Sequence, residues 1–506
     1  MSAHADLLHD LLDEAVAARP DAPAVSSAGR TLTYRELDAA SRRLAAWLLE
    51  QGLERGDRLV VCAPGTVAQP ALVYAASRVG VTFSLLHEQV RGVQLEHVLE
   101  DCEPALLVTD DAAAREAAHR RDVRTRSTAF LSEAAFADGP VPQGTPRGPL
   151  AVDPVCLIYT SGTTSLPKAV VSTHRQLTFS VRAIQSVLGY RPADVVYSPL
   201  PLSFDYGLYQ LFLSTLAGAH VTLGRPAEVG PALLNNLARA GATVLAAVPS
   251  VAEALARLLR RARARTDTPP LRLLTNTGAA MPAETLRSLR ASLPDLHVQL
   301  MFGLTECKRA TIMPPDGDLE RPGSSGRALP GTEVFVVDDD GRRLPPGDIG
   351  EIVVRGPNVM AGYWRRPELT AQRFRRAEGL FPQLHTGDYG WVDEAGYLYF
   401  DGRRDDIYKE SGFRVSATEV EAAARRVPGV TAAAVLPPRH PARALLFVVS
   451  TLEPSDVLSG MREQIEEFKI PGHCLPVDTL PLTGNGKVDR KALAALAEEA
   501  AGVRTR

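Results

Sequence analysis

The sequence predicts an α/β protein made of a large N-terminal domain of layered α/β subdomains plus a small β subdomain, followed by a small C-terminal α+β domain. Up to about Phe400, short β-branched runs such as Asp57–Cys62, Val155–Tyr159 and Ala242–Val248 alternate with amphipathic stretches rich in alanine and leucine. This alternation is typical of layered α/β structure. With 506 residues, of which 45% are hydrophobic and 23% charged, the chain is long enough for several packed cores.

The N-terminal stretch Met1–Pro20 predicts a helix. It carries histidines and carboxylates among its leucines and alanines, and it lacks the basic segment and apolar core of a signal peptide. No apolar run reaches the roughly 18 residues that a membrane-spanning helix needs, so a cytoplasmic location is expected. Farther along, the alanine-rich tract Ala112–Ala118 predicts a surface helix, and the Pro/Gly-rich stretch Gly139–Pro149 predicts a linker.

The segment Gly331–Val354 has a pattern of its own. Two strand patterns, Glu333–Val337 and Glu351–Val354, flank a stretch of turn-forming aspartate, glycine and proline residues. We therefore expect a small β subdomain at this place in the chain.

The C-terminal domain is expected after the strand pattern Tyr397–Phe400, where the polar run Asp401–Asp406 marks a boundary. Beyond it, the capping box Ser416–Glu419 opens a helix predicted over Ala417–Arg426, and Lys491–Ala501 predicts a second helix. The sequence thus divides into residues 1–401, a connection over 402–405, and residues 406–506.

Composition excludes some classes of partner. The net charge of −3, from 56 basic and 59 acidic residues, gives no polycationic face for nucleic acid or an anionic membrane, so neither partner is expected. The five cysteines are odd in number, far apart and without CxxC spacing, which argues against a disulfide framework or a zinc site. We expect reduced thiols, most of them packed as small apolar side chains.

A loop rich in hydroxyl groups follows the predicted strand Val155–Tyr159. It runs from Tyr159 to Lys168 as Tyr-Thr-Ser-Gly-Thr-Thr-Ser-Leu-Pro-Lys, and such a loop can wrap polyphosphate oxygens with N–H, hydroxyl and ammonium groups. It is not a Walker A loop, because no glycine precedes Lys168 and no Ser or Thr follows it. Taken alone, a polar surface turn explains this stretch equally well.

Five motifs in order resemble the adenylate-forming superfamily, which includes acyl-CoA synthetases, nonribosomal-peptide adenylation domains and firefly luciferases. The resemblance covers nearly the whole chain, and its motifs are Tyr159–Val170 (phosphate loop), Met301–Glu306, His385–Asp388, Gly402–Asp405 (hinge) and Asn485–Lys491 (catalytic lysine). It implies a mobile C-terminal domain, use of ATP and Mg²⁺ to form an acyl-AMP, and transfer of the acyl group to a thiol. A luciferase-like oxygenase has the same fold but no support in this sequence.

The resemblance also implies the nucleotide site. Phe302 would stack on adenine, Thr305 would hydrogen-bond the α-phosphate, and Glu306 would give Mg²⁺ a hard carboxylate oxygen. Asp388 would accept from the ribose hydroxyls. The full set expected to bind ATP or AMP is Thr160, Ser161, Gly162, Thr163, Thr164, Lys168, Gly278, Ala279, Ala280, Phe302, Gly303, Asp388 and Arg403.

The resemblance implies that Lys487 is the catalytic residue of adenylation, since its ammonium group would hold the attacking carboxylate beside the α-phosphate. An exposed lysine after a Gly-Asn-Gly turn is the alternative. Asp405 matches the hinge about which the C-terminal domain rotates before thiol transfer. The chain departs from the family pattern at Ser165 and Ala169, where glycines are usual, so some backbone approach to the phosphates is expected to be altered.

The acid pocket implied by the resemblance favours an amino acid. Amino-acid adenylation domains have Phe-Asp at the position of Phe204–Asp205, and the aspartate binds the substrate's ammonium group; many acyl-CoA synthetases have a histidine nearby. Asp205 also stands where it would N-cap a helix over Tyr206–Leu216, and that alternative stays open. The pocket residues are Phe204, Asp205, Tyr206, Tyr209, Ala246, Thr275, Thr277, Met301, Arg309 and Ala310.

Two basic residues, Lys308 and Arg309, are unusual for such a pocket. They could meet a second anionic group on the substrate, but the sequence favours solvated loop charges. The pocket residues taken together do not identify the acid, although free-standing ligases of the prolyl type are the nearest resemblance.

The thiol is expected in trans, since no carrier domain with a phosphopantetheine serine follows Lys491. The preferred hypothesis is a ligase that adenylates a small carboxylic or amino acid and loads a free-standing acyl or peptidyl carrier protein. The alternative is an AMP-forming acyl-CoA ligase for a fatty or aromatic acid, although we see no clear basic cluster for the 3′-phosphate of CoA. A non-enzymatic binding role is disfavoured by the motifs around Glu306, Asp388 and Lys487.

Overall fold

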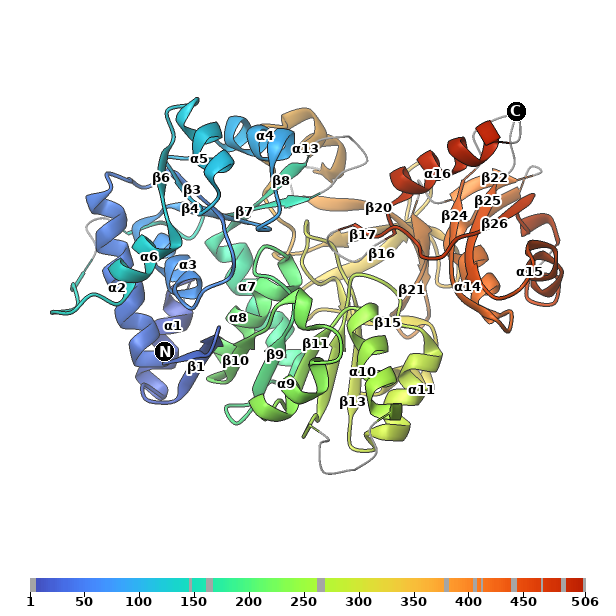
Figure 1. Cartoon of the computed structure of the whole chain (residues 1–506), viewed down its shortest axis with the longest axis horizontal. Helices are drawn as coiled ribbons and strands as arrows, with labels where there is room; N and C mark the ends of the chain where they lie inside the picture. Colours follow the sequence, from blue (N-terminus) through green and yellow to red (C-terminus); the bar gives the residue numbers. More distant parts are fainter. Residues whose placement is uncertain are drawn as a thin grey trace. The chain divides into compact units, whose positions relative to one another are not determined.

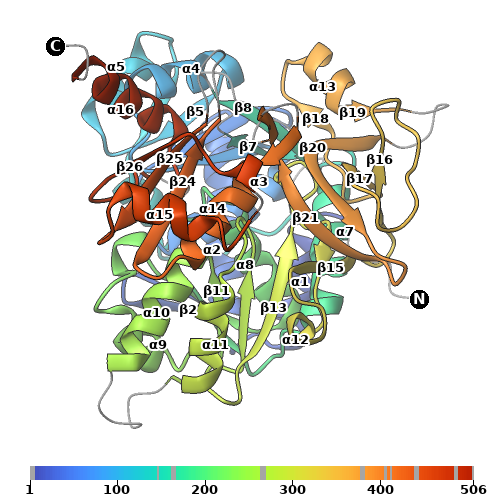
Figure 2. The ribbon, with the colours of Figure 1, turned by 90° about the vertical axis from the view of Figure 1, so that its right-hand side faces the viewer.

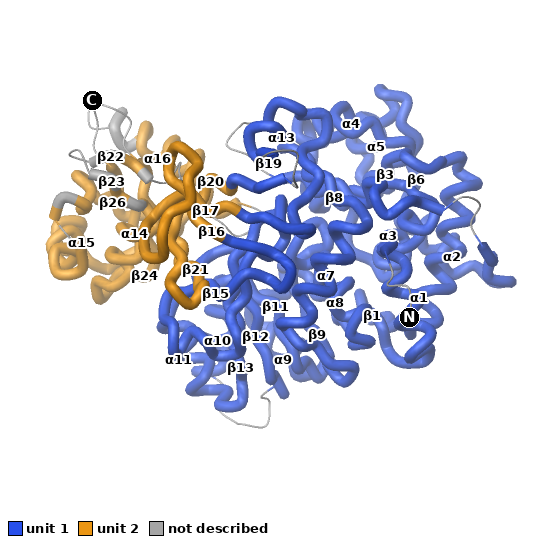
Figure 3. Tube along the Cα trace, turned by 180° about the vertical axis from the view of Figure 1, so that it is seen from behind, with its two compact units in different colours: residues 1–334, 354–385 blue, residues 335–353, 386–506 orange. Residues whose placement is uncertain are grey.

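The computed structural model describes residues 6–144, 148–160, 167–261, 269–376, 382–403, 407–410, 413–437, 444–465, 467–483 and 488–503. They fall into two compact units (Figure 3), residues 1–334 with 354–385 and residues 335–353 with 386–506. In the first unit, helices pack on two sheets (Figure 1). Among the helices of these ranges, none has both the length and the apolar character that a bilayer crossing requires.

One sheet of the first unit has the strand order β18-β8-β7-β4-β3-β5-β6. Strands β6, β5, β3, β4 and β7 are parallel, while β8 is antiparallel to β7 and to β18. The strands are β3 (Arg58–Cys62), β4 (Thr82–Leu86), β5 (Leu106–Val108), β6 (Arg124–Arg126), β7 (Pro154–Thr160), β8 (Lys168–Thr173) and β18 (Gly362–Tyr363). The intervening helices are α3 (Ala68–Val79), α4 (Gly92–Cys102), α5 (Ala112–His119) and α6 (Thr128–Ala135).

The second sheet of this unit has the order β2-β1-β10-β9-β11-β12-β13-β14-β15. Its strands are β1 (Pro23–Ser27), β2 (Arg30–Thr33), β9 (Val195–Ser198), β10 (His220–Leu223), β11 (Val244–Ala247), β12 (Leu273–Asn276), β13 (His297–Phe302), β14 (Thr311–Ile312) and β15 (Ser324–Ala328). The run β1-β10-β9-β11-β12-β13 is parallel. The carboxyl ends of these strands therefore lie along one edge, where open α/β sheets bind ligands.

The remaining elements of the first unit are mostly helices. They are α1 (Asp10–Ala18), α2 (Tyr34–Glu50), α7 (His174–Leu188), α8 (Asp205–Ala217), α9 (Leu233–Ala240), α10 (Pro249–Arg261), α11 (Ala283–Ser292), α12 (Gly317–Glu320), α13 (Pro367–Arg373), the 3₁₀ turn Pro226–Glu228 and the short strand β19 (Phe374–Arg375). Their ends follow local chemistry, as α7 shows. Thr173 and Gln176 form a capping box at its start, and Gly189 ends it in the left-handed conformation.

The second unit contains a sheet with the order β16-β17-β20-β21, the hairpin β22-β23 and the sheet β24-β25-β26 (Figure 2). The strands are β16 (Glu333–Val337), β17 (Gly350–Arg355), β20 (Gln383–Val392), β21 (Tyr397–Arg403), β22 (Ile407–Glu410), β23 (Phe413–Ser416), β24 (Val430–Leu436), β25 (Leu445–Ser450) and β26 (His473–Pro476). Helices α14 (Ala417–Arg426), α15 (Pro454–Met461) and α16 (Arg490–Val503) and the 3₁₀ turn Glu467–Lys469 complete it. Buried residues of α14, β24 and β25 form its core.

This architecture confirms the predicted α/β class. The expected strand Glu333–Val337 and the expected helix Ala417–Arg426 have the observed bounds. The predicted strand end at Phe400 is wrong, because β21 continues through Arg403 and takes in the first residues of the polar run. All five cysteines are buried and free, as expected.

Candidate functional site

The carboxyl ends of the parallel strands bring residues of the predicted acid pocket together. In the ladder of the second sheet, Ala246 of β11 is the partner of Thr275 of β12, and Thr275 is the partner of Gln299 of β13. Met301 lies two residues farther along β13, and Thr277 directly follows β12. The predicted residues from three separate strands thus share one edge of the sheet.

Helix α8 packs its first turns against this edge. The Tyr206 hydroxyl donates to the carbonyl oxygen of Thr275 at 2.7 Å and lies 2.6 Å from the Thr275 hydroxyl. Burial raises the pKa of Tyr206 to about 12, so the phenol stays a neutral donor. Gly207 permits the close packing, because a Cβ there would lie 2.3 Å from the carbonyl oxygen of Pro201.

Asp205 lies in a buried cluster with two cations. The Asp205 carboxylate is 3.1 Å from Nζ of Lys308 and 3.2 Å from a terminal nitrogen of Arg309. The exposed fractions of these residues are 5%, 0% and 3%, respectively. Beyond the ion pair, neither Nζ of Lys308 nor Nε of Arg309 forms a hydrogen bond with a residue of the described ranges. One carboxylate faces two cations, so the cluster carries a net positive charge and retains donors for another acceptor.

The two cations lie on the tight hairpin between β13 and β14, which places them beside the start of α8. The amide of Ala310 donates to the carbonyl oxygen of Phe302, which closes the chain between β13 and β14. Gly303 is required there, because a Cβ would lie 2.1 Å from the carbonyl oxygen of Lys308. Lys308 itself has a φ of 63°, a left-handed conformation that costs a non-glycine residue on the order of 1 kcal/mol or more. Such strain persists where surrounding contacts hold it, and it is common at functional sites.

Two expectations from the sequence are wrong at this cluster. Lys308 and Arg309 are not solvated loop charges, because both are buried against Asp205. Asp205 is not an N-cap either, since α8 begins at Asp205 itself, its N-cap is Phe204, and no side chain caps it. The buried ion pairs explain why the aspartate lies at the helix start.

The cluster includes further predicted residues through its aromatic contacts. The Arg309 guanidinium carbon lies 4.7 Å from the centre of the Tyr206 ring, and Nζ of Lys308 lies 5.7 Å from that of Tyr209. Phe204, Ala246, Thr277, Met301 and Ala310 occupy the adjoining helix start, strand ends and hairpin. The structure therefore joins Asp205, Tyr206, Tyr209, Thr275 and Arg309, and adds Lys308 to them.

The predicted phosphate loop is described at its two ends. Thr160, the last residue of β7, pairs with Lys168, the first residue of β8, whereas Ser161, Gly162, Thr163, Thr164 and Ser165 lie outside the described residues. A ring nitrogen of His97 in α4 lies 2.8 Å from the carbonyl oxygen of Pro167. Ala169 is the second residue of β8, and its side chain is buried.

Glu306 and Lys168 meet beside a tyrosine that sequence reasoning missed. The Tyr363 hydroxyl donates to Oε1 of Glu306 at 2.7 Å, and Nζ of Lys168 lies 3.8 Å from the same oxygen. The carboxylate is a hard oxygen donor of the type Mg²⁺ prefers, and it keeps acceptor capacity beside the phenol, so it fits a metal ion. Thr305 precedes it in the hairpin, and Phe302 and Gly303 lead into it.

Gly278, Ala279 and Ala280 follow β12 in a loop at the same sheet edge. Gly278 has a φ of 92°, which accounts for a glycine at this position.

Of the predicted nucleotide residues in the second unit, Asp388 and Arg403 are cross-strand partners on β20 and β21. Asp388 is 3% exposed, and its backbone amide donates to the Thr386 hydroxyl oxygen at 3.0 Å. Lys487 and Asp405 lie outside the described residues.

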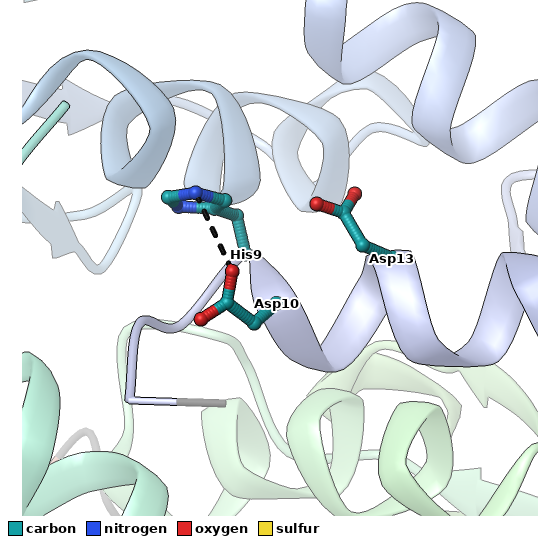
Figure 4. A group of neighbouring side chains, drawn as sticks. All are labelled: His9, Asp10 and Asp13. Carbon is teal, nitrogen blue, oxygen red and sulfur yellow. Dashed lines mark ion pairs between the residues drawn. The ribbon is translucent and has the colours of Figure 1, made fainter. Parts of the chain in front are cut away.

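A separate group of potential metal ligands, His9, Asp10 and Asp13, lies at the start of α1 (Figure 4). Asp13 is engaged by two guanidinium groups, with Arg78 at 2.5 Å and Arg42 at 3.4 Å. His9 faces the Ser77 hydroxyl at 2.9 Å through Nδ1. Because two arginines already neutralise the carboxylate, this group is an ion-pair network that ties α1 to α2 and α3.

Comparison with known proteins identifies the family. A family model described as AMP-binding enzyme matches residues 12–364, and that of the AMP-binding enzyme C-terminal domain matches residues 419–487. Feruloyl-CoA synthase from Amycolatopsis sp is 32% identical, over 93% of this chain and 94% of that protein. The structure of VinN in complex with L-aspartate is 39% identical with a TM-score of 0.70, over 79% of this chain and 100% of that one. ATP-bound MatB from Rhodopseudomonas palustris is 30% identical with a TM-score of 0.86, over 96% of this chain and 98% of that one. The chain therefore belongs to the AMP-binding enzyme family and is an AMP-forming acid–thiol ligase that uses ATP.

Proposed function

We propose that this ligase adenylates a small amino acid bearing a second carboxylate, and then transfers it to the phosphopantetheine thiol of a free-standing carrier protein. The observation that carries the proposal is the buried cluster of Asp205, Lys308 and Arg309. Aspartate is the simplest acid of this class. An amino acid of the prolyl type is disfavoured, since it has no second acidic group.

Charge balance selects this class of acid. A buried ion without a partner costs several kcal/mol, so a buried site favours the substrate that neutralises it. The cluster has one net positive charge, and an amino acid with two carboxylates has one net negative charge. A zwitterionic amino acid with a single carboxylate would leave the positive charge unmatched, and a fatty acid would leave Asp205 facing an apolar chain.

Both charged groups that distinguish such a substrate would have oppositely charged partners in the cluster. Its ammonium group would approach Asp205, and its second carboxylate would accept from the unused donors of Lys308 and Arg309. The reacting carboxylate would then face the nucleotide. The likeness to VinN, whose structure was determined with L-aspartate, supports the proposal.

The adenylation step is assigned to residues of the predicted nucleotide site. Glu306 would hold Mg²⁺, which when bound offsets the negative charge of the phosphates. Thr305 and Lys168 would orient the phosphates, Phe302 would stack on adenine, and Asp388 with Arg403 would bind the ribose. Lys487 would hold the attacking carboxylate against the α-phosphate, and rotation about Asp405 would then admit the thiol.

CoA is the second candidate for the thiol, because relatives such as feruloyl-CoA synthase are named for it. Pyrophosphate release with hydroxylamine as acceptor, measured for aspartate, proline, ferulate and a long-chain fatty acid, identifies the acid class. The thiol is identified by offering the enzyme a phosphopantetheinylated carrier protein or CoA under the same conditions. Acylation of the carrier protein is measured by its intact mass and compared with the formation of acyl-CoA. The proposal predicts aspartate and the carrier protein. Activity with ferulate or the fatty acid and CoA would replace it with an acyl-CoA ligase.

A further inference from the structure

We propose that Tyr363 is a positioning residue that fixes the Glu306 carboxylate for the metal ion of the nucleotide complex. The proposal rests on the metal-binding role proposed above for Glu306. Its basis is that the Tyr363 side chain contacts both Glu306 and Lys168. The hydroxyl donates to Glu306 at 2.7 Å, and the Lys168 ammonium lies 4.0 Å from the centre of the ring.

Tyr363 is fixed by backbone and side-chain contacts. It belongs to β18, where it pairs with Val170 of β8. Its amide donates to the Thr370 hydroxyl at 3.0 Å, and its ring meets that of Phe374 edge-on, with the ring centres 5.3 Å apart. With 5% of its surface exposed, the side chain has little freedom to move. A rigid donor of this kind can restrict the conformations of the residue that it binds.

The hydrogen bond from Tyr363 orients the Glu306 carboxylate without occupying all of its acceptor positions. A carboxylate has about four acceptor positions, so one bond from a neutral phenol leaves room for a cation. Outer partners that fix a metal-binding carboxylate lower the cost of ordering it when the metal arrives.

The connection that leads into β18 supports the hairpin between β13 and β14, since the Asn358 side-chain amide donates to the carbonyl oxygens of Cys307 and Arg309, both at 3.2 Å. The segment from Asn358 to Tyr363 thus braces the hairpin at its backbone and at Glu306. Within this segment, the Met360 amide donates to the backbone carbonyl of Glu306 at 2.8 Å, whereas the Tyr363 hydroxyl contacts the Glu306 carboxylate, the proposed metal ligand.

The test is metal binding without turnover. Free Mn²⁺ is measured by electron paramagnetic resonance during titration of the enzyme with α,β-methylene ATP, which cannot release pyrophosphate. Tyr363→Phe keeps the ring, its packing and the lysine contact while removing the hydroxyl. We expect roughly tenfold weaker Mn²⁺ binding, the range for losing a hydrogen bond to a charged group, with the KM for the acid unchanged.

Tyr34→Phe is the matched control, because it removes another buried hydroxyl, one that donates to the carbonyl oxygens of Ser214 and Ala219. Glu306→Gln tests the underlying role, and the double variant Glu306→Gln/Tyr363→Phe tests the coupling. If the hydroxyl acts through the carboxylate, adding Tyr363→Phe to Glu306→Gln changes Mn²⁺ binding no further.

The outcomes separate the two hypotheses. Weaker Mn²⁺ binding in Glu306→Gln and in Tyr363→Phe, but not in Tyr34→Phe, supports the positioning role. Weaker binding in Glu306→Gln alone overturns it and leaves the metal role intact. Unchanged binding in Glu306→Gln overturns both, and equal losses in the two tyrosine variants reduce the effect of Tyr363 to general packing.

Discussion

Replacing Lys308 by methionine should convert the acid pocket from one that prefers two carboxylates to one that does not. The change removes one buried cation and keeps an unbranched side chain of similar length. Asp205 retains its ion pair with Arg309 at 3.2 Å, so no charge in the cluster loses its only partner. The left-handed backbone at this position strains lysine and methionine alike, which makes the comparison a test of charge.

The expected magnitude follows from the burial of the cluster. Lys308 is 0% exposed, so the lost attraction is that of a desolvated pair, about 2–4 kcal/mol. For aspartate, kcat/KM should therefore fall by roughly 30- to 1,000-fold. For asparagine, which has the same shape without the second charge, the change should stay within about threefold.

The assay is pyrophosphate release with each amino acid in turn, with the Tm measured for both proteins. Arg91→Met is the control for loss of a positive charge, since the Arg91 side chain is 67% exposed and only loosely paired with Asp111 at 3.7 Å. Equal losses for aspartate and asparagine in Lys308→Met, with an unchanged Tm, would refute the role of this lysine in recognising a second carboxylate.

Three further predictions concern charge and burial. Asp205→Asn should lower both the Tm and kcat/KM for aspartate, because it leaves two buried cations without their carboxylate, a change worth about 3–5 kcal/mol; an unchanged Tm would contradict the burial argument. Lys487→Ala should nearly abolish acyl-AMP formation while thiol transfer from supplied acyl-AMP survives, and intact adenylation would remove it from the mechanism. Acid should destabilise the protein, because burial lowers the pKa of His9 to about 4 and that of His174 to about 3, whereas the unfolded chain binds these protons near 6.5. Stability is then full above pH 6.5 and falls as the pH decreases toward 4, by about 2 kcal/mol per group at pH 5, and His174→Gln should flatten the pH dependence of the Tm.

The sequence was most informative where local chemistry sets the structure. The capping residues at Ser416–Glu419 predicted α14, and β-branched runs predicted β3, β7 and β11 to within a few residues. These features depend on neighbours a few positions away, which a sequence pattern records directly.

The sequence was least informative where side chains meet across the fold. The basic pair Lys308–Arg309 has the composition of a solvated loop, and only the tight hairpin after Gly303 turns it inward. Asp205 had the position of an N-cap, but two cations more than 100 residues away hold it instead. Tyr363 and Glu306 are 57 residues apart, and no local pattern marks the tyrosine as a partner of the motif.

The most direct test of the central claim is a comparison of kcat/KM for pyrophosphate release with aspartate, asparagine and succinate on one preparation of the enzyme. Asparagine lacks the second carboxylate, and succinate lacks the ammonium group. A pocket in which Asp205, Lys308 and Arg309 read both groups should favour aspartate over each by at least roughly tenfold. If asparagine or succinate matches aspartate, the buried cluster does not select the substrate and the account is contradicted.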